Sequence, residues 1–425
     1  MQDSIYHKDN LKVLGRLFKK YREETGYSIR GVSRSINISH TVISDIENCK
    51  IYPNRETLKE LYDAIDVPLC IDETILKECQ QILEALNEAI YFWEPHDIVA
   101  LSEKLKKHDI RILHSPLRID YILAQQLVDV MYHHKLETFN PALLEDDFDF
   151  MSSKQQATVH FIKGIHSFYS QQYETSLPYF TKNIKNLHED KLFALSVFYL
   201  SFAYNKLYRN YETLYYADIA SNILTKQSNK KLKIEIDLLK AQKWIDEGYI
   251  EPAKNIVHSL QNAIEFQQEV TDISNRFEPF KIYLLYSEKK YDEALEYISA
   301  LNRKEPSHLL FKAIIAHKVN NEPLIKKSLE DLLMLPNKDD QYFVIGQVFA
   351  YLKEGDVNKE TVYKTIESVL KRPYRFVSVH LLHMMFDLIF EVYFKNNETE
   401  RLIKALKIYK SIQKSRDNHE TNLYK

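Results

Sequence analysis

The feature that most constrains the fold of this chain is a segment that recurs along its second half. Four copies align with one another, over residues 164–180, 202–218, 241–257 and 282–298. In each copy a helix-like pattern ends at a polar turn, and a tyrosine or isoleucine follows at a fixed place. These residues are Tyr173, Tyr211, Ile250 and Tyr291, at spacings of 38, 39 and 41 residues. Because one such unit cannot bury its apolar face alone, neighbouring units stack, and the repeat predicts an α-solenoid.

A small or apolar residue lies three residues after each of the four repeated tyrosine or isoleucine positions. These residues are Ser176, Leu214, Ala253 and Ala294. Weaker copies lie around 313–332, 341–370 and 386–409. The pattern resembles the tetratricopeptide repeat, whose period is about 34 residues, so the helices here are expected to be longer or the loops extended. A solenoid of this kind presents a concave surface, lined by the first helix of each pair, that suits an extended peptide. The alternative is that the repeats only space or dimerise the protein.

Composition supports an all-α fold. The 425 residues include only seven glycines and twelve prolines. Hairpin turns and phosphate-binding loops depend on glycine, so a β-protein or a nucleotide enzyme has little to be built from. The 29 tyrosines are an unusual number of amphipathic rings, which can serve in the core, in a groove, or in both.

Charge, cysteine usage and hydropathy favour a cytoplasmic protein that does not enter a membrane. The formal net charge of −3 gives no global field that attracts nucleic acid or membrane. Cys49, Cys70 and Cys79 form no CxxC pair, which fits a reducing compartment. The start of the chain carries no apolar signal segment, and the most apolar run, 193–204, is well short of the ~20 residues that span a bilayer.

Residues 10–66 form a compact set of short helices in this interpretation. Apolar spacing and capping residues predict helices over 11–24, 29–36, 40–47 and 56–65. A tight turn at 37–39 precedes the third helix, in which Val42, Ile43 and Ile46 are expected to face inward. Longer helices are then expected over 73–92, 96–107 and 118–135.

The same region carries the basic character that the whole chain lacks. Between Lys12 and Arg55 there are nine basic residues against four acidic ones, a local net charge of +5. A basic patch confined to one small module is the electrostatic footprint expected of a nucleic-acid-binding domain.

The order of these helices resembles the Xre/Cro-type helix-turn-helix family over the whole segment. The landmarks are Leu14-Gly15, Gly26-Tyr27-Ser28, Asn37-Ile38-Ser39, Ile43-Ser44, Ile46-Glu47, Pro53, and Leu58, Leu61 and Ile65. The resemblance implies that helix 40–47 lies in the major groove of DNA. It implies base contacts by His40, Thr41 and Ser44 on the solvent face of that helix. The residues expected to contact phosphates are Arg30, Arg34, Lys50 and Arg55.

Three positions depart from the family pattern. Ile29 stands where the family commonly has a phosphate-contacting glutamine, and Asp45 replaces a residue that is often basic or polar. Cys49 stands where glycine often ends the reading helix. Asp45 repels phosphate, and a cysteine makes a left-handed C-cap harder unless Asn48 takes that conformation, so modest affinity per monomer is expected.

A helix-turn-helix followed by a tetratricopeptide-like solenoid resembles the RRNPP group of bacterial peptide-pheromone receptors. The expected domains are 1–68 for DNA binding, 69–155 as a helical linker or degenerate repeats, and 156–425 for peptide binding and dimerisation. The resemblance implies a cytoplasmic homodimeric quorum-sensing regulator that binds an inverted-repeat operator in double-stranded DNA. It also implies that a short linear signalling peptide, held in the solenoid, changes dimer geometry or oligomeric state.

Peptide-binding candidates follow from what an extended peptide needs. Asn or Gln side chains clamp its backbone, aromatic side chains form pockets, and a charge holds a terminus. The candidates on the inner face of the first helices are Tyr169, Tyr199, Asn205, Lys206, Gln242, Tyr283 and Tyr286. Asn205 is the favoured one, because relatives in this group use asparagines on these helices against the peptide backbone.

Enzyme, cofactor and metal functions are not expected. The sequence has no GxxxxGK[ST], GxSxG or HExxH motif, and His380, His383 and Asp387 lie in an apolar stretch where a structural role is favoured. The alternative to a DNA-binding regulator is an adaptor whose solenoid sequesters a signalling protein such as a response regulator. In that case the helix-turn-helix could serve only protein contact.

Overall fold

The computed structural model describes most of the chain, and all of its regular structure is helical. The described residues are 8–70, 72–137, 148–186, 190–265, 271–301, 304–336, 340–353, 357–371 and 379–422. No strand occurs within these ranges, so the expected all-α fold is confirmed. The chain divides into two compact units, 1–199 and 200–425.

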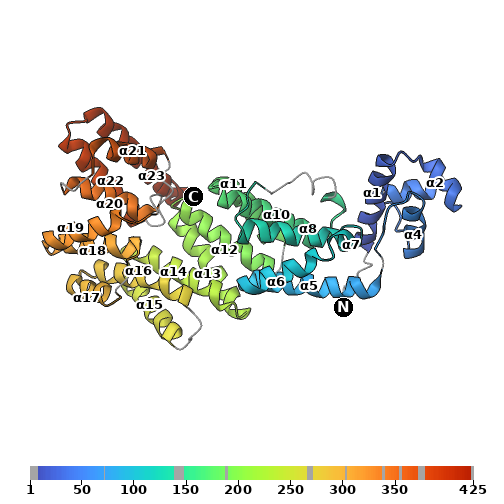
Figure 1. Ribbon diagram of the computed structural model, residues 1–425. Helices are drawn as coiled ribbons and strands as arrows, with labels where there is room; N and C mark the ends of the chain where they lie inside the picture. The colour runs from blue at the N-terminus through green and yellow to red at the C-terminus, as the bar shows by residue number, and fades with distance from the viewer. Residues whose placement is uncertain are drawn as a thin grey trace. The chain divides into compact units, whose positions relative to one another are not determined.

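The N-terminal module of the first unit is built on one small core. Its helices are α1 (Lys8–Glu24), α2 (Ile29–Ile36), α3 (His40–Glu47) and α4 (Arg55–Asp63) (Figure 1). The core residues are Leu14, Leu17, Phe18, Val32, Ile43, Ile46, Leu58, Leu61, Tyr62 and Ile65. The Tyr62 hydroxyl is buried and donates a hydrogen bond of 2.9 Å to the Leu14 carbonyl oxygen. The third helix has the predicted bounds, and the fourth is displaced by one or two residues at its ends.

Side-chain caps start these helices where the sequence predicts them. The Ser28 hydroxyl accepts from the Gly31 N–H at 3.0 Å, and the Ser39 hydroxyl accepts from the Thr41 N–H at 3.3 Å. Both caps satisfy N–H groups that the helix itself leaves unpaired. The sequence therefore determines the start of the second and third helices locally.

The end of α3 differs from the expectation. Cys49 itself takes the left-handed conformation, with φ of 58°, whereas Asn48 has φ of −97°. The Cys49 N–H bonds to the Ile46 carbonyl at 3.0 Å, and the Lys50 N–H bonds to the Asp45 carbonyl at 2.8 Å. This pair of bonds is a Schellman motif, in which the residue after the C-cap is the left-handed one.

The rest of the first unit continues with longer helices. They are α5 (Glu73–Phe92), α6 (Pro95–Lys106), α7 (Asp109–Leu113), α8 (Arg118–Leu127), α10 (Ser153–Tyr169) and α11 (Tyr173–Asn186). A short 3-10 turn, Phe148–Phe150, precedes α10. The single helix predicted over 118–135 is wrong in its second half, because α8 passes into a π-helical turn, Val128–Tyr132. The short helix α7 was not predicted.

The remaining helices form successive pairs, as the repeat predicts. They are α12 (Lys191–Lys206), α13 (Asn210–Lys226), α14 (Lys230–Asp246), α15 (Ile250–Glu265), α16 (Thr271–Ser287), α17 (Tyr291–Leu301), α18 (Pro306–Lys318), α19 (Glu322–Leu333), α20 (Gln341–Leu352), α21 (Lys359–Lys371), α22 (Val379–Lys395) and α23 (Thr399–Asn422). Within the second unit α14 packs on α15, α18 on α19, and α22 on α23 (Figure 1). The weaker copies are therefore also helix pairs.

The turns within these pairs close in one way. Their left-handed residues are Gln171, Tyr208, Gly248, Lys289, Asn320 and Asn397. In each described turn the N–H of the next residue bonds to a carbonyl five positions earlier, as between Tyr249 and Trp244 at 2.8 Å. This bond satisfies a carbonyl at the helix end and reverses the chain. Five of these six left-handed residues are not glycine, although glycine is the residue that usually takes this conformation. This explains how a chain with few glycines forms these turns.

The structure corrects the alignment of the second repeat copy by one residue. The first residues of α11, α15 and α17 are Tyr173, Ile250 and Tyr291, but α13 begins at Asn210, one position before Tyr211. Counted from the helix starts, the residues three positions on are Ser176, Thr213, Ala253 and Ala294, and all are fully buried. Thr213 therefore replaces Leu214 in this pattern. The tripeptide Tyr-Glu-Thr occurs in both of the first two copies. Aligning these two tripeptides places the second copy one residue out of register with the helix starts.

In the described residues, no helix is both long and apolar enough to span a membrane.

Candidate functional site

The exposed face of α3 is the first candidate site. His40 and Thr41 are exposed, and Ser44 is half-buried. Val42, which was expected to face inward, is 37% exposed, so that expectation is wrong. Ile43, Ile46 and Glu47 are the buried residues of this helix. The buried face of α3 therefore differs from the face that Val42, Ile43 and Ile46 define. The difference arises because the charged residue Glu47 is buried and Val42 is not.

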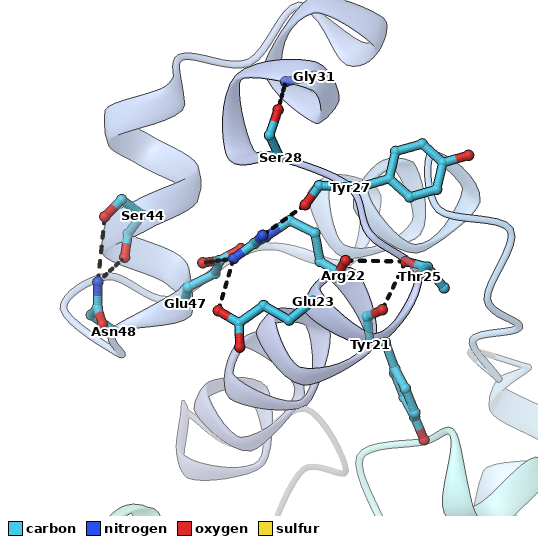
Figure 2. Close-up of polar contacts among 10 residues, drawn as sticks. All are labelled: Tyr21, Arg22, Glu23, Thr25, Tyr27, Ser28, Gly31, Ser44, Glu47 and Asn48. Carbon is cyan, nitrogen blue, oxygen red and sulfur yellow. Dashed lines mark hydrogen bonds and ion pairs between the residues drawn. The ribbon is translucent and has the colours of Figure 1, made fainter.

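That charged residue belongs to a buried ion pair. The Glu47 side chain is 1% exposed and meets Arg22 at the end of α1, with distances of 2.5 Å from Nε to Oε1 and 3.0 Å from Nη2 to Oε2. Arg22 Nη1 also donates to the Tyr27 carbonyl oxygen at 2.8 Å (Figure 2). The Glu47 carboxylate raises the pKa of the Arg22 guanidinium. The sequence analysis counted both residues only as surface charge and missed this contact.

The pair connects three parts of the module. Arg22 ends α1, Tyr27 lies in the loop before α2, and Glu47 ends α3 (Figure 2). A bidentate arginine–carboxylate contact has fixed geometry as well as strength. The contact therefore orients α3 relative to α1 and the following loop.

Close packing of α1 on α3 adds a second constraint. A Cβ atom at Gly15 would lie 2.8 Å from the Ile46 carbonyl oxygen and 2.9 Å from Ile46 Cγ2. Distances this short are not tolerated by real side chains, so glycine is required for the observed approach. Gly15 is one of the landmarks of the family pattern, and the structure gives the reason for it.

The four residues expected at phosphates fall into two groups. Arg30 and Arg34 on α2 are exposed, and neither forms an ion pair with any described residue. Lys50 is exposed but lies 3.4 Å from Asp45, and Arg55 contacts Glu73 of α5 at 2.8 Å. The α2 arginines are therefore the better placed cations, because no protein carboxylate competes with a phosphate for them.

Ser44 is partly engaged within α3. The Asn48 side-chain amide donates to the Ser44 carbonyl oxygen at 2.7 Å and to its hydroxyl oxygen at 3.3 Å (Figure 2). This contact leaves the Ser44 hydroxyl proton available for donation to a base. His40 and Thr41 lie at the N-terminal end of the helix, where reading helices of this type contact base edges.

The second candidate site lies on the first helices of the repeat pairs, where the sequence analysis placed seven residues. In the first unit, the hydroxyls of Tyr169 and Tyr199 are 3.0 Å apart. Tyr199 is 5% exposed and packs against Phe161, Phe168 and Phe180. Burial raises the pKa of Tyr199 well above its usual value. These contacts are those of a packed aromatic cluster.

In the second unit, Asn205 and Lys206 end α12. The Asn205 side chain is buried, at 2% exposed, and its Oδ1 atom has no hydrogen-bond partner. Lys206 is half-buried and forms no ion pair with the described residues. Burial, and to a smaller extent the charge of Lys243, lower the pKa of Lys206 to about 8. A buried acceptor and a half-buried cation without partners are costly arrangements that a ligand could relieve.

A polar network on α14 and α16 lies beside Lys206. Lys243 Nζ is 2.8 Å from Asp246 Oδ2, and both side chains are fully buried. The Tyr283 hydroxyl donates to the other Asp246 oxygen at 3.1 Å. The sequence analysis named Tyr283 but missed Lys243 and Asp246. Lys243 lies on the same helical face as the apolar Ile236 and Leu239, seven and four positions earlier, and a lysine on that face is the signal that could have found it.

The last two candidates have ordinary packing environments. Gln242, on α14 beside Lys243, is 5% exposed. Tyr286 on α16 is half-buried, with its ring centroid 5.8 Å from that of Tyr291 on α17. Burial raises the pKa of Tyr286.

Comparison with known proteins gives one family match and several structural ones. Residues 13–71 match a helix-turn-helix domain family. No curated protein sequence matches the chain significantly. The crystal structure of a Rap protein complexed with competence and sporulation factor is 16% identical, with a TM-score of 0.61, over 80% of this chain and 98% of that one.

Two structures of the quorum sensor NprR are also similar. The apo form from B. thuringiensis is 13% identical with a TM-score of 0.57, over 80% of this chain and 99% of that one. The complex of NprR with its cognate peptide NprX is 13% identical with a TM-score of 0.55, over 79% and 99%. The chain therefore carries an N-terminal helix-turn-helix domain and has the fold of the Rap and NprR structures.

Proposed function

We propose that the chain is a quorum-sensing transcriptional regulator that binds operator DNA and is controlled by a short linear signalling peptide. The observation that carries the DNA-binding part is the exposed surface of α2 and α3. His40 and Thr41 are exposed on α3, and α2 exposes two arginines that no described carboxylate neutralises. A rigid reading helix with free cations on the preceding helix is what recognition of a major groove requires.

Each side chain has a role in this proposal. His40, Thr41 and Ser44 contact base edges. Arg30 and Arg34 contact phosphates, with Lys50 and Arg55 as weaker contributors because each already meets a carboxylate. Val42, exposed on the same helix, can add an apolar contact to a thymine methyl group.

The peptide is proposed to bind along α12, α14 and α16. Asn205, Lys206, Gln242, Tyr283 and Tyr286 come from these helices, and Tyr169 and Tyr199 of the first unit stay separate predictions of peptide contact. Support comes from the unpaired Oδ1 of Asn205 and from the likeness to an NprR structure that contains its cognate peptide. In this proposal the protein is a cytoplasmic homodimer, and the peptide alters dimer geometry or oligomeric state.

Selection of duplex DNA from a random library tests the DNA-binding part. Purified full-length protein is used at moderate salt, beside the double variant His40→Ala, Thr41→Ala. Wild type is expected to enrich one sequence motif that the double variant does not enrich. Equal enrichment by the variant would overturn the assignment of these residues to base contacts. A library that stays random with wild type, with and without added peptide, would overturn DNA binding itself.

The second candidate function is a protein-interaction adaptor that sequesters a signalling protein such as a response regulator. Tyr211 and Tyr215 on α13 favour it, because they are 56% and 53% exposed and their rings are nearly parallel at 6.4 Å. Exposed aromatic side chains are enriched at protein interfaces. Salt separates the two functions. DNA affinity falls steeply with salt through release of counterions, and Arg34→Ala should reduce the logarithmic slope by about 0.9. An adaptor would show no DNA affinity to lose.

A further inference from the structure

The end of α12 holds two polar groups that this chain leaves without partners. Asn205 Oδ1 is buried and accepts no hydrogen bond. The adjacent ammonium of Lys206 is half-buried and forms no ion pair within the described residues. Buried acceptors are nearly always paired in folded proteins, and a half-buried cation also gains from a partner, so these two adjacent groups indicate that something outside the chain pairs with them.

The carboxylate of the neighbouring Lys243 network is already engaged by other groups. Asp246 is fully buried, and its two oxygens are already bound by Lys243 at 2.8 Å and by the Tyr283 hydroxyl at 3.1 Å. The charges of Lys243 and Asp246 therefore neutralise each other without Lys206. Lys243 instead adds a like charge close enough to lower the pKa of Lys206.

A contact between neighbouring turns holds the two lysines near each other. Asn210, the first residue of α13, donates through its amide to Glu247, which follows α14. Lys206 lies four positions before Asn210, across the turn between α12 and α13, and Lys243 lies one helical turn before Glu247. The local excess of positive charge is therefore built into the packing of these helix ends rather than produced by a mobile side chain.

We propose that Lys206 and Asn205, beside the Lys243–Asp246–Tyr283 network, form a subsite for a carboxylate of the bound peptide. The carboxylate pairs with the Lys206 ammonium, and a neighbouring peptide N–H donates to Asn205 Oδ1. The inference rests on the proposed function, because it names the part of the peptide that this position accepts. The carboxylate comes either from the peptide's C-terminus or from an Asp or Glu side chain.

The test uses synthetic heptapeptide libraries and the full-length protein. One library has free C-terminal carboxylates and contains no Asp or Glu. A second has amidated C-termini and contains them, and a third is amidated and contains none. Peptides retained by the protein are identified by mass spectrometry, resynthesised and titrated against wild type, Lys206→Met and the control Lys230→Met. Lys230 is an exposed lysine at the start of α14.

Retention from the first library alone assigns the subsite to the C-terminal carboxylate. Retention from the second, with an acidic residue at one position, assigns it to a side chain. In both cases Lys206→Met should weaken binding roughly 10- to 100-fold, as expected for a lost charged hydrogen bond, and Lys230→Met should not. Because Lys206→Met removes a repelled cation, the variant is expected to fold, and thermal unfolding checks this.

Two results would overturn the subsite. If peptides from the third library bind as tightly as any others, and equally to Lys206→Met, the carboxylate subsite is wrong while peptide binding stands. If no library yields a retained peptide, the peptide-binding function fails together with the subsite.

Discussion

The residue with the largest structural consequence in the N-terminal module is Glu47. A carboxylate that is 1% exposed is stable only because Arg22 meets both of its oxygens. Burying two charges costs desolvation energy, so the pair itself adds little net stability, but removal of one partner leaves the other charge unpaired. The pair therefore determines which face of α3 is buried, and so which face remains for DNA.

Arg22→Met should destabilise the module by about 3 kcal/mol, and the double variant Arg22→Met, Glu47→Met should recover most of that loss. The reason is that the single variant strands the Glu47 carboxylate in the core, whereas the double variant removes both charges. Hydrogen exchange of the α3 amides in the full-length protein measures the difference. Similar protection of α3 in wild type and Arg22→Met would contradict this account.

Lys206 gives a prediction on pH. Its pKa is about 8 in the folded chain against 10.5 as the usual value. Between these two values the unfolded chain binds the proton that the folded chain has lost, so stability rises with pH. Lys206 therefore lowers stability below pH 8, and this cost disappears as the pH approaches 10.5.

Calorimetry of wild type and Lys206→Met at pH 7 and pH 10 checks this effect. The variant should be the more stable protein at pH 7, and the difference in melting temperature should shrink at pH 10. The comparison cancels the titration of tyrosines, which both proteins share. A difference that is the same at both pH values would show that Lys206 titrates normally.

At the scale of elements, α3 is held by α1 and presents its outer face. The close approach at Gly15 and the ion pair at the end of α1 act on the same helix from two places. The exposure of Thr41 follows from this arrangement, because Thr41 lies on the side of the helix opposite Ile43, Ile46 and Glu47, and Val42 lies at the border of that buried stripe. In the proposed function, recognition by α3 therefore depends on contacts between α3 and α1 that do not themselves touch DNA.

Gly15→Ala should displace α3 from α1 and weaken DNA binding without any change in surface charge. The added Cβ would meet backbone as well as side-chain atoms of Ile46, so the clash cannot be relieved by a rotamer change. The expected loss of stability is about 1–3 kcal/mol, typical of overpacking. The measurement is the affinity for the selected DNA, with Gly26→Ala as a comparison, because that glycine has open space but a φ of 79°. Unchanged affinity in Gly15→Ala would show that α3 tolerates the shift.

At the scale of the whole molecule, the proposed regulator combines a DNA-binding module with a solenoid in each chain. Dimerisation then brings two DNA-binding modules together. Dimeric helix-turn-helix proteins bind two half-sites about 34–36 Å apart, so the symmetry of the protein appears in the sequence of the operator. Modest affinity per monomer, expected from Asp45 at the DNA surface, makes the second half-site necessary.

The selected DNA motif should be an inverted repeat. Scrambling one half-site should lower affinity at least tenfold, because it removes one of two linked binding events. Sedimentation of the protein with each DNA then gives the stoichiometry. One protein chain per DNA, with equal affinity for full and half-sites, would argue against a homodimeric regulator.

The sequence by itself determined the helices and the repeat. Helix starts follow from local caps such as Ser28 and Ser39, and the repeat period follows from a pattern that each copy carries within itself. These features depend on residues a few positions apart, so they can be read without tertiary contacts. The contacting roles of the candidate residues stay predictions, because no bound DNA or peptide tests them.

The tertiary structure decided the features that depend on distant partners. It placed Glu47 in the core and Val42 outside, because the partner of Glu47 lies 25 positions earlier on another helix. The tertiary structure also shifted the alignment of the second repeat copy by one residue. The buried Thr213 sets the register of this copy, and the similarity of the adjacent sequence does not. The tertiary structure also brought Lys243, Asp246 and Tyr283 together beside Lys206. Hydrophobic periodicity predicts the buried face of a helix only approximately. In α3 the ion pair between Glu47 and the distant Arg22 determines which face is finally buried.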